Sequence, residues 1–226
     1  MYLRSWINLL TMAEAIFASL IAINLYKQVR KYFNSLDAAG SLPIERKEII
    51  FFAILFFSTM LFSVGKVDMA VLWMHIGNLV FLSFLAYTDF KTKLLDVPIL
   101  VYLLIQNVSF FILFCFFNNT YEWGKLYFLC AYIAAVVFCC MVKAVAKGDG
   151  FIYLAMLPAI LIMENPCGIP VSLLFLLLPL FLFLIVESGK AVFRKSLKTL
   201  LSERKPFAPY LLAGYIISFW IYVKGC

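Results

Sequence analysis

The feature that most constrains this chain is a series of apolar tracts, most of them close to a membrane crossing in length, separated by short polar connections. A hydrocarbon core about 30 Å thick is crossed by a helix of roughly 20 apolar residues. Of the 226 residues, 65% are hydrophobic, whereas a soluble domain carries about 45–50% apolar residues. The sequence therefore predicts an all-α, polytopic integral membrane protein.

The tracts predict about eight transmembrane helices. Their approximate ranges are 6–26, 49–64, 69–88, 98–117, 124–145, 150–163, 171–186 and 208–223. The first tract is long enough to remain as a span, so a cleaved signal peptide is not expected. The short sixth tract has a re-entrant alternative, which would move the strongly basic connection at 187–207 to the opposite side. Eight crossings are therefore the favoured interpretation.

Positive charge is concentrated on one side of this predicted topology. With eight spans, 15 of the 19 Lys and Arg residues fall in four connections that share a side. These connections are 27–48, 89–97, 143–149 and 187–207. Cytoplasmic loops carry the excess of Lys and Arg, so both termini are expected outside. The net charge of +7 then reflects topology and contact with membrane lipid, and no nucleic-acid partner is expected.

Two acidic residues reach the same membrane boundary in this topology. Asp89 ends the third span, and Asp149 begins the sixth between Gly148 and Gly150. Acids at such positions are functional candidates. Two carboxylates brought close share a proton and titrate as a unit. In an aspartic protease, the ionised member draws a proton from water while the protonated member polarises the scissile carbonyl.

Other residues of the sequence bear on how a substrate would reach this pair and on whether a metal would assist it. The glycines beside Asp149 allow unusual backbone angles and close approach of an extended substrate strand. The six cysteines contain no Cys-x-x-Cys pair, so neither a zinc knuckle nor a redox motif is expected. The catalytic candidates are therefore Asp89 and Asp149, and the predicted chemistry uses no metal and no cofactor.

Three segments, in order, carry a resemblance to a known family. They are residues 86–95 (AYTDFKTKLL), 146–155 (AKGDGFIYLA) and 205–211 (KPFAPYL). Together they resemble the type IV prepilin peptidases, membrane aspartyl proteases with a Gly-x-Gly-Asp motif. Order and helix count agree over residues 69–226. The resemblance implies a six-helix peptidase-like core at 69–226, preceded at 1–68 by two transmembrane helices with a short cytoplasmic loop.

The resemblance also implies an activity. It is that of an aspartic-type endopeptidase that cleaves the leader peptide of type IV prepilins or pseudopilins, just after a glycine at the cytoplasmic face of a bacterial inner membrane. Asp89 and Asp149 would be its catalytic residues. The chain departs from the family in having Ala146 at the first motif glycine. The connection 27–48 has no cysteine and is too short for the zinc-binding methyltransferase insert of many members, so N-methylation is not assigned.

Structural alternatives exist for both acids. Asp149 has the alternative of a helix N-cap, for which Asp is a preferred residue. Asp89 has the alternative of a solvated loop acid paired with Lys91 or Lys93. Asp96 is a rival for the role of Asp89, because it follows the same apolar pair of residues.

Further alternatives concern two other polar residues and the protein as a whole. Glu187 either supports the site or extends toward Lys190 at the membrane edge. His75, near the centre of the third span, is expected to make an interhelical hydrogen bond. For the whole protein, the alternative is a catalytically silent membrane component of a pilus or type II secretion assembly.

Overall fold

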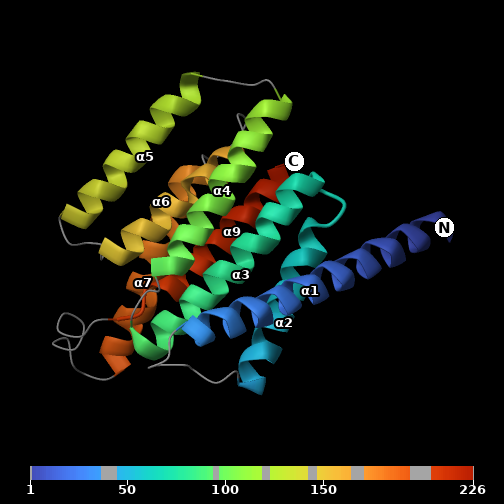
Figure 1. Cartoon of the computed structure of the whole chain (residues 1–226), viewed down its shortest axis with the longest axis horizontal. Coiled ribbons are helices and arrows are strands. Elements are labelled where there is room, and N and C mark those ends of the chain that lie inside the picture. Colours follow the sequence, from blue (N-terminus) through green and yellow to red (C-terminus); the bar gives the residue numbers. More distant parts are fainter. Residues whose placement is uncertain are drawn as a thin grey trace. The chain divides into compact units, whose positions relative to one another are not determined.

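The computed structural model describes residues 2–36, 45–93, 97–118, 123–141, 147–163, 171–193 and 205–225. Over these ranges the chain forms eight helices and no strand, which confirms the all-α class (Figure 1). The helices are α1 Tyr2–Leu36, α2 Arg46–Ser63, α3 Met69–Thr92, α4 Val97–Asn118, α5 Trp123–Met141, α6 Lys147–Ile162, α7 Val171–Phe193 and α9 Ala208–Gly225.

Three helices in the described ranges are long and apolar enough to cross a membrane. Their spans are Met69–Thr92 in α3, Val97–Phe116 in α4 and Val171–Lys190 in α7. Gly148–Ile162 in α6 is apolar but shorter. These helices support the membrane class.

Several helices run past the apolar tracts from which they were predicted. α1 continues to Leu36 and α7 to Phe193, because polar residues such as Lys, Gln and Arg are good helix formers. α3 continues to Thr92 and ends where Lys93 adopts a left-handed φ of 57°. The Lys93 N–H then donates to the carbonyl of Asp89 at 2.8 Å, as in an αL helix end. Asp89 therefore lies inside α3 and not in the connection after it.

The described helices divide into two compact units, residues 1–84 and 85–225. We call them unit 1 and unit 2. The boundary falls within α3, and the division at residue 68 between two N-terminal helices and a peptidase-like core stays a prediction. Hydropathy locates the start of a span but does not report which neighbours its two halves contact.

Unit 1 is held together by a buried ionic cluster between α1 and α2. Tyr26 donates its hydroxyl hydrogen to Glu48, and Arg30 Nε lies 3.5 Å from Glu48 Oε1. The Arg30 guanidinium stacks over the ring of Phe84, 5.2 Å from its centroid. Glu48 also forms a capping box with Glu45 at the start of α2. Such a cluster gives each buried charge a partner, which burial in an apolar interior requires.

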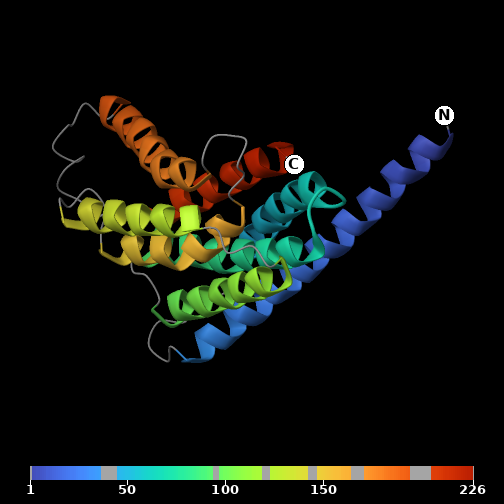
Figure 2. The ribbon, with the colours of Figure 1, turned by 90° about the horizontal axis from the view of Figure 1, so that it is seen from above.

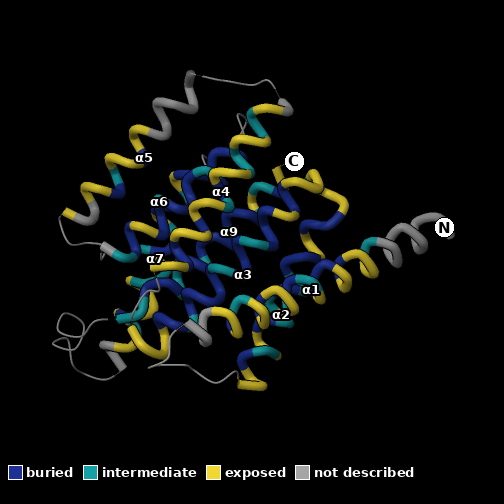
Figure 3. Tube along the Cα trace, in the orientation of Figure 1, coloured by how far each residue is buried: buried dark blue, intermediate teal, exposed yellow. Residues whose placement is uncertain are grey.

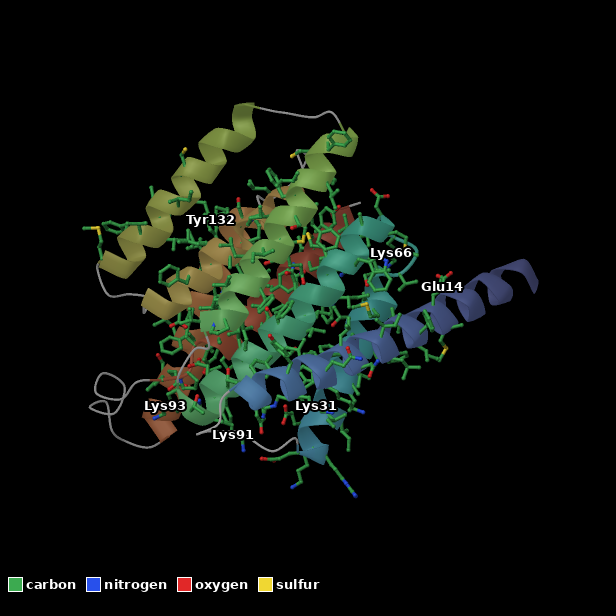
Figure 4. The ribbon with its side chains drawn as sticks, in the orientation of Figure 1. Glu14, Lys31, Lys66, Lys91, Lys93 and Tyr132 are labelled. Atoms are coloured by element: carbon green, nitrogen blue, oxygen red, sulfur yellow. The ribbon has the colours of Figure 1, made fainter. Side chains whose placement is uncertain are left out.

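The charged residues of unit 1 lie at both of its ends. Figure 4 shows Glu14 and Lys66 toward one end and Lys31 toward the other. The membrane sides assigned to Lys66 and Lys31 from the charge distribution stay a prediction.

Unit 2 is a set of antiparallel and crossing helices packed on α6 and α7. α6 contacts α4, α5 and α7, and α7 contacts α9. Figure 2 shows α5 lying along α6. Among the helices that lie wholly within unit 2, α6 and α9 are the most buried, while α5 is largely exposed over its described side chains (Figure 3).

A proline inside α6 is accommodated by a neighbouring helix. Pro158 has no N–H and so removes one intrahelical hydrogen bond. Asn107 of α4 donates its side-chain amide to the carbonyl of Ala155 at 3.0 Å, one turn before the proline. In an apolar environment, backbone groups near a proline need such a partner.

The same solution recurs at Pro179 in α7, where α9 also approaches closely. Tyr153 of α6 donates its hydroxyl hydrogen to the carbonyl of Leu176 at 3.2 Å, again one turn before the proline. On α9, a Cβ placed on Gly214 would lie 2.5 Å from Pro179 Cγ and 2.9 Å from Cδ. Only glycine at 214 permits this separation of α7 and α9.

The contact between Gly214 and Pro179 predicts a stability difference between two glycine substitutions. Gly214→Ala should lower the free energy of unfolding by about 1–3 kcal/mol, because it overpacks a rigid ring. Gly189→Ala, in α7 with no atom within 4 Å of the added Cβ, should be neutral or stabilising by up to about 1 kcal/mol. Thermal unfolding in detergent measures both, and equal midpoints for the two variants would contradict the packing described.

Candidate functional site

The carboxylate of Asp89 meets the start of α9. Asp89 lies in the last turn of α3 and is 3% exposed. Its Oδ2 atom accepts hydrogen bonds from the N–H of Phe207 at 2.7 Å and from the N–H of Ala208 at 2.9 Å. The solvated-loop alternative for Asp89 is therefore wrong. Two segments separated by 118 positions, both among the three that carry the family resemblance, are joined at this point.

This contact completes the hydrogen bonding of the first turn of α9. A helix begins with N–H groups that have no intrahelical acceptor. In α9, Pro209 has no N–H, and the N–H of Tyr210 donates to the carbonyl of Phe207 at 3.0 Å. The N–H groups of Phe207 and Ala208 remain, and both donate to Asp89. The helix has no acid in its own first turn, so Asp89 supplies the acceptor and the negative charge that a helix N-terminus favours.

Asp149 occupies the first turn of α6. Because the helix begins at Lys147, Asp149 is its third residue, so the N-cap alternative is wrong. The side chain is buried, with the residue 7% exposed. The negative charge is favourably placed at a helix N-terminus.

The flanking glycines have helical backbone conformation and do not use the unusual angles that glycine allows. Gly148 and Gly150 both lie within α6, and among the described glycines a positive φ occurs at Gly65. The reason is that α6 begins at Lys147, before both glycines, which places them in helical conformation. Gly150 is buried, so its role is to let other groups approach the helix closely.

The two predicted catalytic acids are thus both buried and both belong to unit 2. Buried carboxylates persist only where polar or charged groups compensate them. The shared proton of an Asp89–Asp149 pair stays a prediction. Asp96 and Ala146, the rival acid and the altered motif position, lie outside the described residues.

Glu187 of α7 joins its own helix to the segment before α9. Lys190 Nζ lies 2.6 Å from Glu187 Oε1, which confirms the predicted pairing along the helix. Lys205 Nζ lies 2.8 Å from Oε2, and the Tyr210 hydroxyl donates to Oε1 at 3.0 Å. These last two partners were not predicted. The available signal was the lysine and tyrosine on either side of the Pro-Phe-Ala-Pro run.

Aromatic rings cover the Asp89 contact. The ring centroid of Phe207 lies 5.5 Å from that of Phe183, 6.3 Å from Tyr210 and 6.4 Å from Tyr153. Edge-on and tilted ring pairs at these separations are favourable. They also exclude water, which strengthens the hydrogen bonds beneath them.

An open, mainly apolar groove of about 360 Å³ lies beside this contact, between the end of α3, α7 and the start of α9. Its walls include Phe90, Val186, Lys190, Pro206, Pro209 and Tyr210. Lys91 and Lys93 lie at the same end of α3 (Figure 4) and are exposed. The groove is therefore mainly apolar with one lysine, Lys190, in its wall.

Other polar candidates do not join this site. His75 is fully buried in the part of α3 that belongs to unit 1. Over the described residues, no group of three or more His, Cys, Asp and Glu side chains is placed to hold a metal ion.

Comparisons of this chain with family models, with curated proteins and with solved structures found no match.

The Asp89 contact predicts a specific effect on stability. Asp89→Ala should lower the free energy of unfolding by about 1–3 kcal/mol, because it leaves two buried N–H groups without an acceptor. Asp89→Asn, which keeps a carbonyl oxygen, should cost less. Thermal unfolding of the detergent-solubilised protein measures the difference. Glu14→Ala, at an exposed acid of α1, is the control, and an Asp89→Ala midpoint equal to that control would contradict the role of Asp89 as the cap of α9.

Proposed function

We propose that this protein is a membrane aspartyl endopeptidase that removes leader peptides from type IV prepilin-like or pseudopilin-like substrates. The observation that carries the proposal is the contact between Asp89 and the N–H groups of Phe207 and Ala208. It joins the first and third segments of the family resemblance, which a chance similarity of short motifs gives no reason to expect. The buried Asp149, in the second segment, supplies the other acid.

In the proposed reaction, Asp89 and Asp149 share one proton and activate a water molecule between them. The ionised carboxylate accepts a proton from the water as its oxygen adds to the scissile carbonyl carbon. The protonated carboxyl donates its proton toward the carbonyl oxygen. Collapse of the resulting diol intermediate breaks the C–N bond: the amine of the new N-terminus takes the proton that the first carboxylate accepted from water, and a diol hydroxyl returns a proton to the second carboxylate. No metal or cofactor is needed for these steps.

The proposed setting is a bacterial inner membrane crossed by all eight predicted spans. The eight described helices occupy the positions of the eight apolar tracts, and three of them meet the length and apolarity of a crossing. The cytoplasmic side then receives the end of α3 and the start of α6. Substrates with a short basic leader and an apolar helix would present their cleavage point at this boundary.

The second candidate function is a catalytically silent component of a pilus or type II secretion assembly. One observation favours it: capping α9 gives Asp89 a purely structural reason to be an acid. The candidates differ in what they require of Asp149, because a silent component needs no proton transfer there.

Substitution of the acids separates the two candidates. Co-expression with a prepilin should give leader cleavage by the wild type and a loss of at least about 100-fold in Asp149→Asn and Asp89→Asn, since general acid–base catalysis contributes about 10²–10⁴-fold. Glu14→Gln, an exposed acid in unit 1, should cleave at the wild-type rate. The measurement is the ratio of mature to precursor substrate by mass spectrometry. Normal cleavage by either Asn variant would show that the assigned pair is wrong.

The proposed topology has an independent test. Lys66→Cys should react with a membrane-impermeant maleimide added to intact cells, whereas Lys91→Cys should react only after the membrane is opened. Both lysines are exposed. The unsubstituted protein gives the background of its native cysteines, and labelling of Lys91→Cys in intact cells would reverse the assigned sides.

A further inference from the structure

We infer that Glu187 is a positioning residue, which holds the segment before α9 so that its two N–H groups point at Asp89. As a statement about catalysis, this inference rests on the proposed function. As a statement about geometry, it stands on the contacts of α7 and α9 alone.

The contacts of Glu187 lie on both sides of the two N–H groups. Lys205, two residues before Phe207, binds Oε2 at 2.8 Å. Tyr210, two residues after Ala208, donates to Oε1 at 3.0 Å. One carboxylate therefore holds the segment at a point before and a point after the pair that Asp89 accepts from.

The segment between these points is stiff. Pro206 and Pro209 each fix the backbone φ near −65°, which leaves few rotations between the two anchored ends. Phe207 is further held against the rings of Phe183 and Tyr153. Anchoring the ends of such a segment fixes the direction of the N–H groups within it.

The two lysines bound to Glu187 are not equivalent. The Lys205 side chain is 17% exposed, whereas that of Lys190 is 54% exposed. Exposed pairs are screened by solvent and contribute little. Lys190 also lies on the same helix as Glu187, three residues away, so its pair does not connect α7 to the start of α9. Lys190 is therefore a matched control for Lys205.

The catalytic consequence follows from orientation. If Asp89 is catalytic, small displacements of its carboxylate misalign it with the water and the scissile carbonyl, and such misplacement costs rate more than binding. Glu187 does not touch the reacting atoms in this scheme. Its removal should lower kcat and leave KM nearly unchanged.

Amide hydrogen exchange on the full chain in lipid nanodiscs tests the geometric inference. In Glu187→Gln and in Lys205→Met, the N–H groups of Phe207 and Ala208 should exchange about tenfold faster than in the wild type, because local opening of the α9 start becomes easier. In Lys190→Met they should change by less than about twofold. The double variant Glu187→Gln/Lys205→Met should exchange no faster than Glu187→Gln, since both changes remove the same tie. Unchanged exchange in Glu187→Gln and Lys205→Met, or an equal effect in Lys190→Met, overturns the inference.

Cleavage kinetics on the same proteins test the catalytic part. Glu187→Gln should lower kcat about tenfold with KM within about twofold, and Glu187→Asp should recover part of kcat. A wild-type kcat in Glu187→Gln, with an active wild type, overturns the positioning role while the proposed function stands. An inactive wild type overturns the proposed function, and the exchange measurement then decides the geometric role by itself. Thermal unfolding of each variant identifies any that fails to fold. If Glu187→Gln does not fold, Lys205→Met, which retains Glu187, tests the same contact.

Discussion

The interaction on which unit 2 depends is the acceptance of two α9 amides by the Asp89 carboxylate. A helix that starts in apolar surroundings must bond its first N–H groups. The Pro-Phe-Ala-Pro run offers no side-chain acceptor for them, so α9 requires an acid from elsewhere. The same acid would be costly at the end of α3 without those amides. The end of α3 and the start of α9 therefore stabilise each other. The aromatic rings around Phe207 and the contacts of Glu187 lie around these hydrogen bonds.

Polar side chains elsewhere in the chain have the same purpose. Asn107 and Tyr153 donate to backbone carbonyls near the two intrahelical prolines. In unit 1, Glu48 is bound by Arg30 and Tyr26. The first two bonds lie beside the break in a helix, and the third gives a buried charge its partners. A chain with few polar residues thus uses them at the places where its helices begin, bend or meet.

Local properties of the sequence predict the helices well and the contacts between them poorly. Runs of apolar residues locate all eight described helices. Helix ends are predicted less well: the third tract ends at residue 88, where the apolar run stops, whereas α3 continues to Thr92. Burial of Asp89 and Asp149 follows from their place beside apolar tracts. The donors to Asp89 cannot be predicted in this way, because Phe207 lies 118 positions further along the chain. The helical conformation of the glycines beside Asp149 does not follow from the sequence, because a glycine permits positive φ without requiring it.

The pairing of Asp89 with the last described helix also has a consequence for how the protein is made. A ribosome that adds about 5–20 residues per second needs on the order of 10 s to travel from Asp89 to Phe207. During that interval the acid is already synthesised while its amide donors are not. The two amide donors therefore reach Asp89 only after the start of α9 has been made. Closure of this contact is consequently a late event in biogenesis, and a chain truncated before Phe207 lacks the donors that tie α9 to the end of α3.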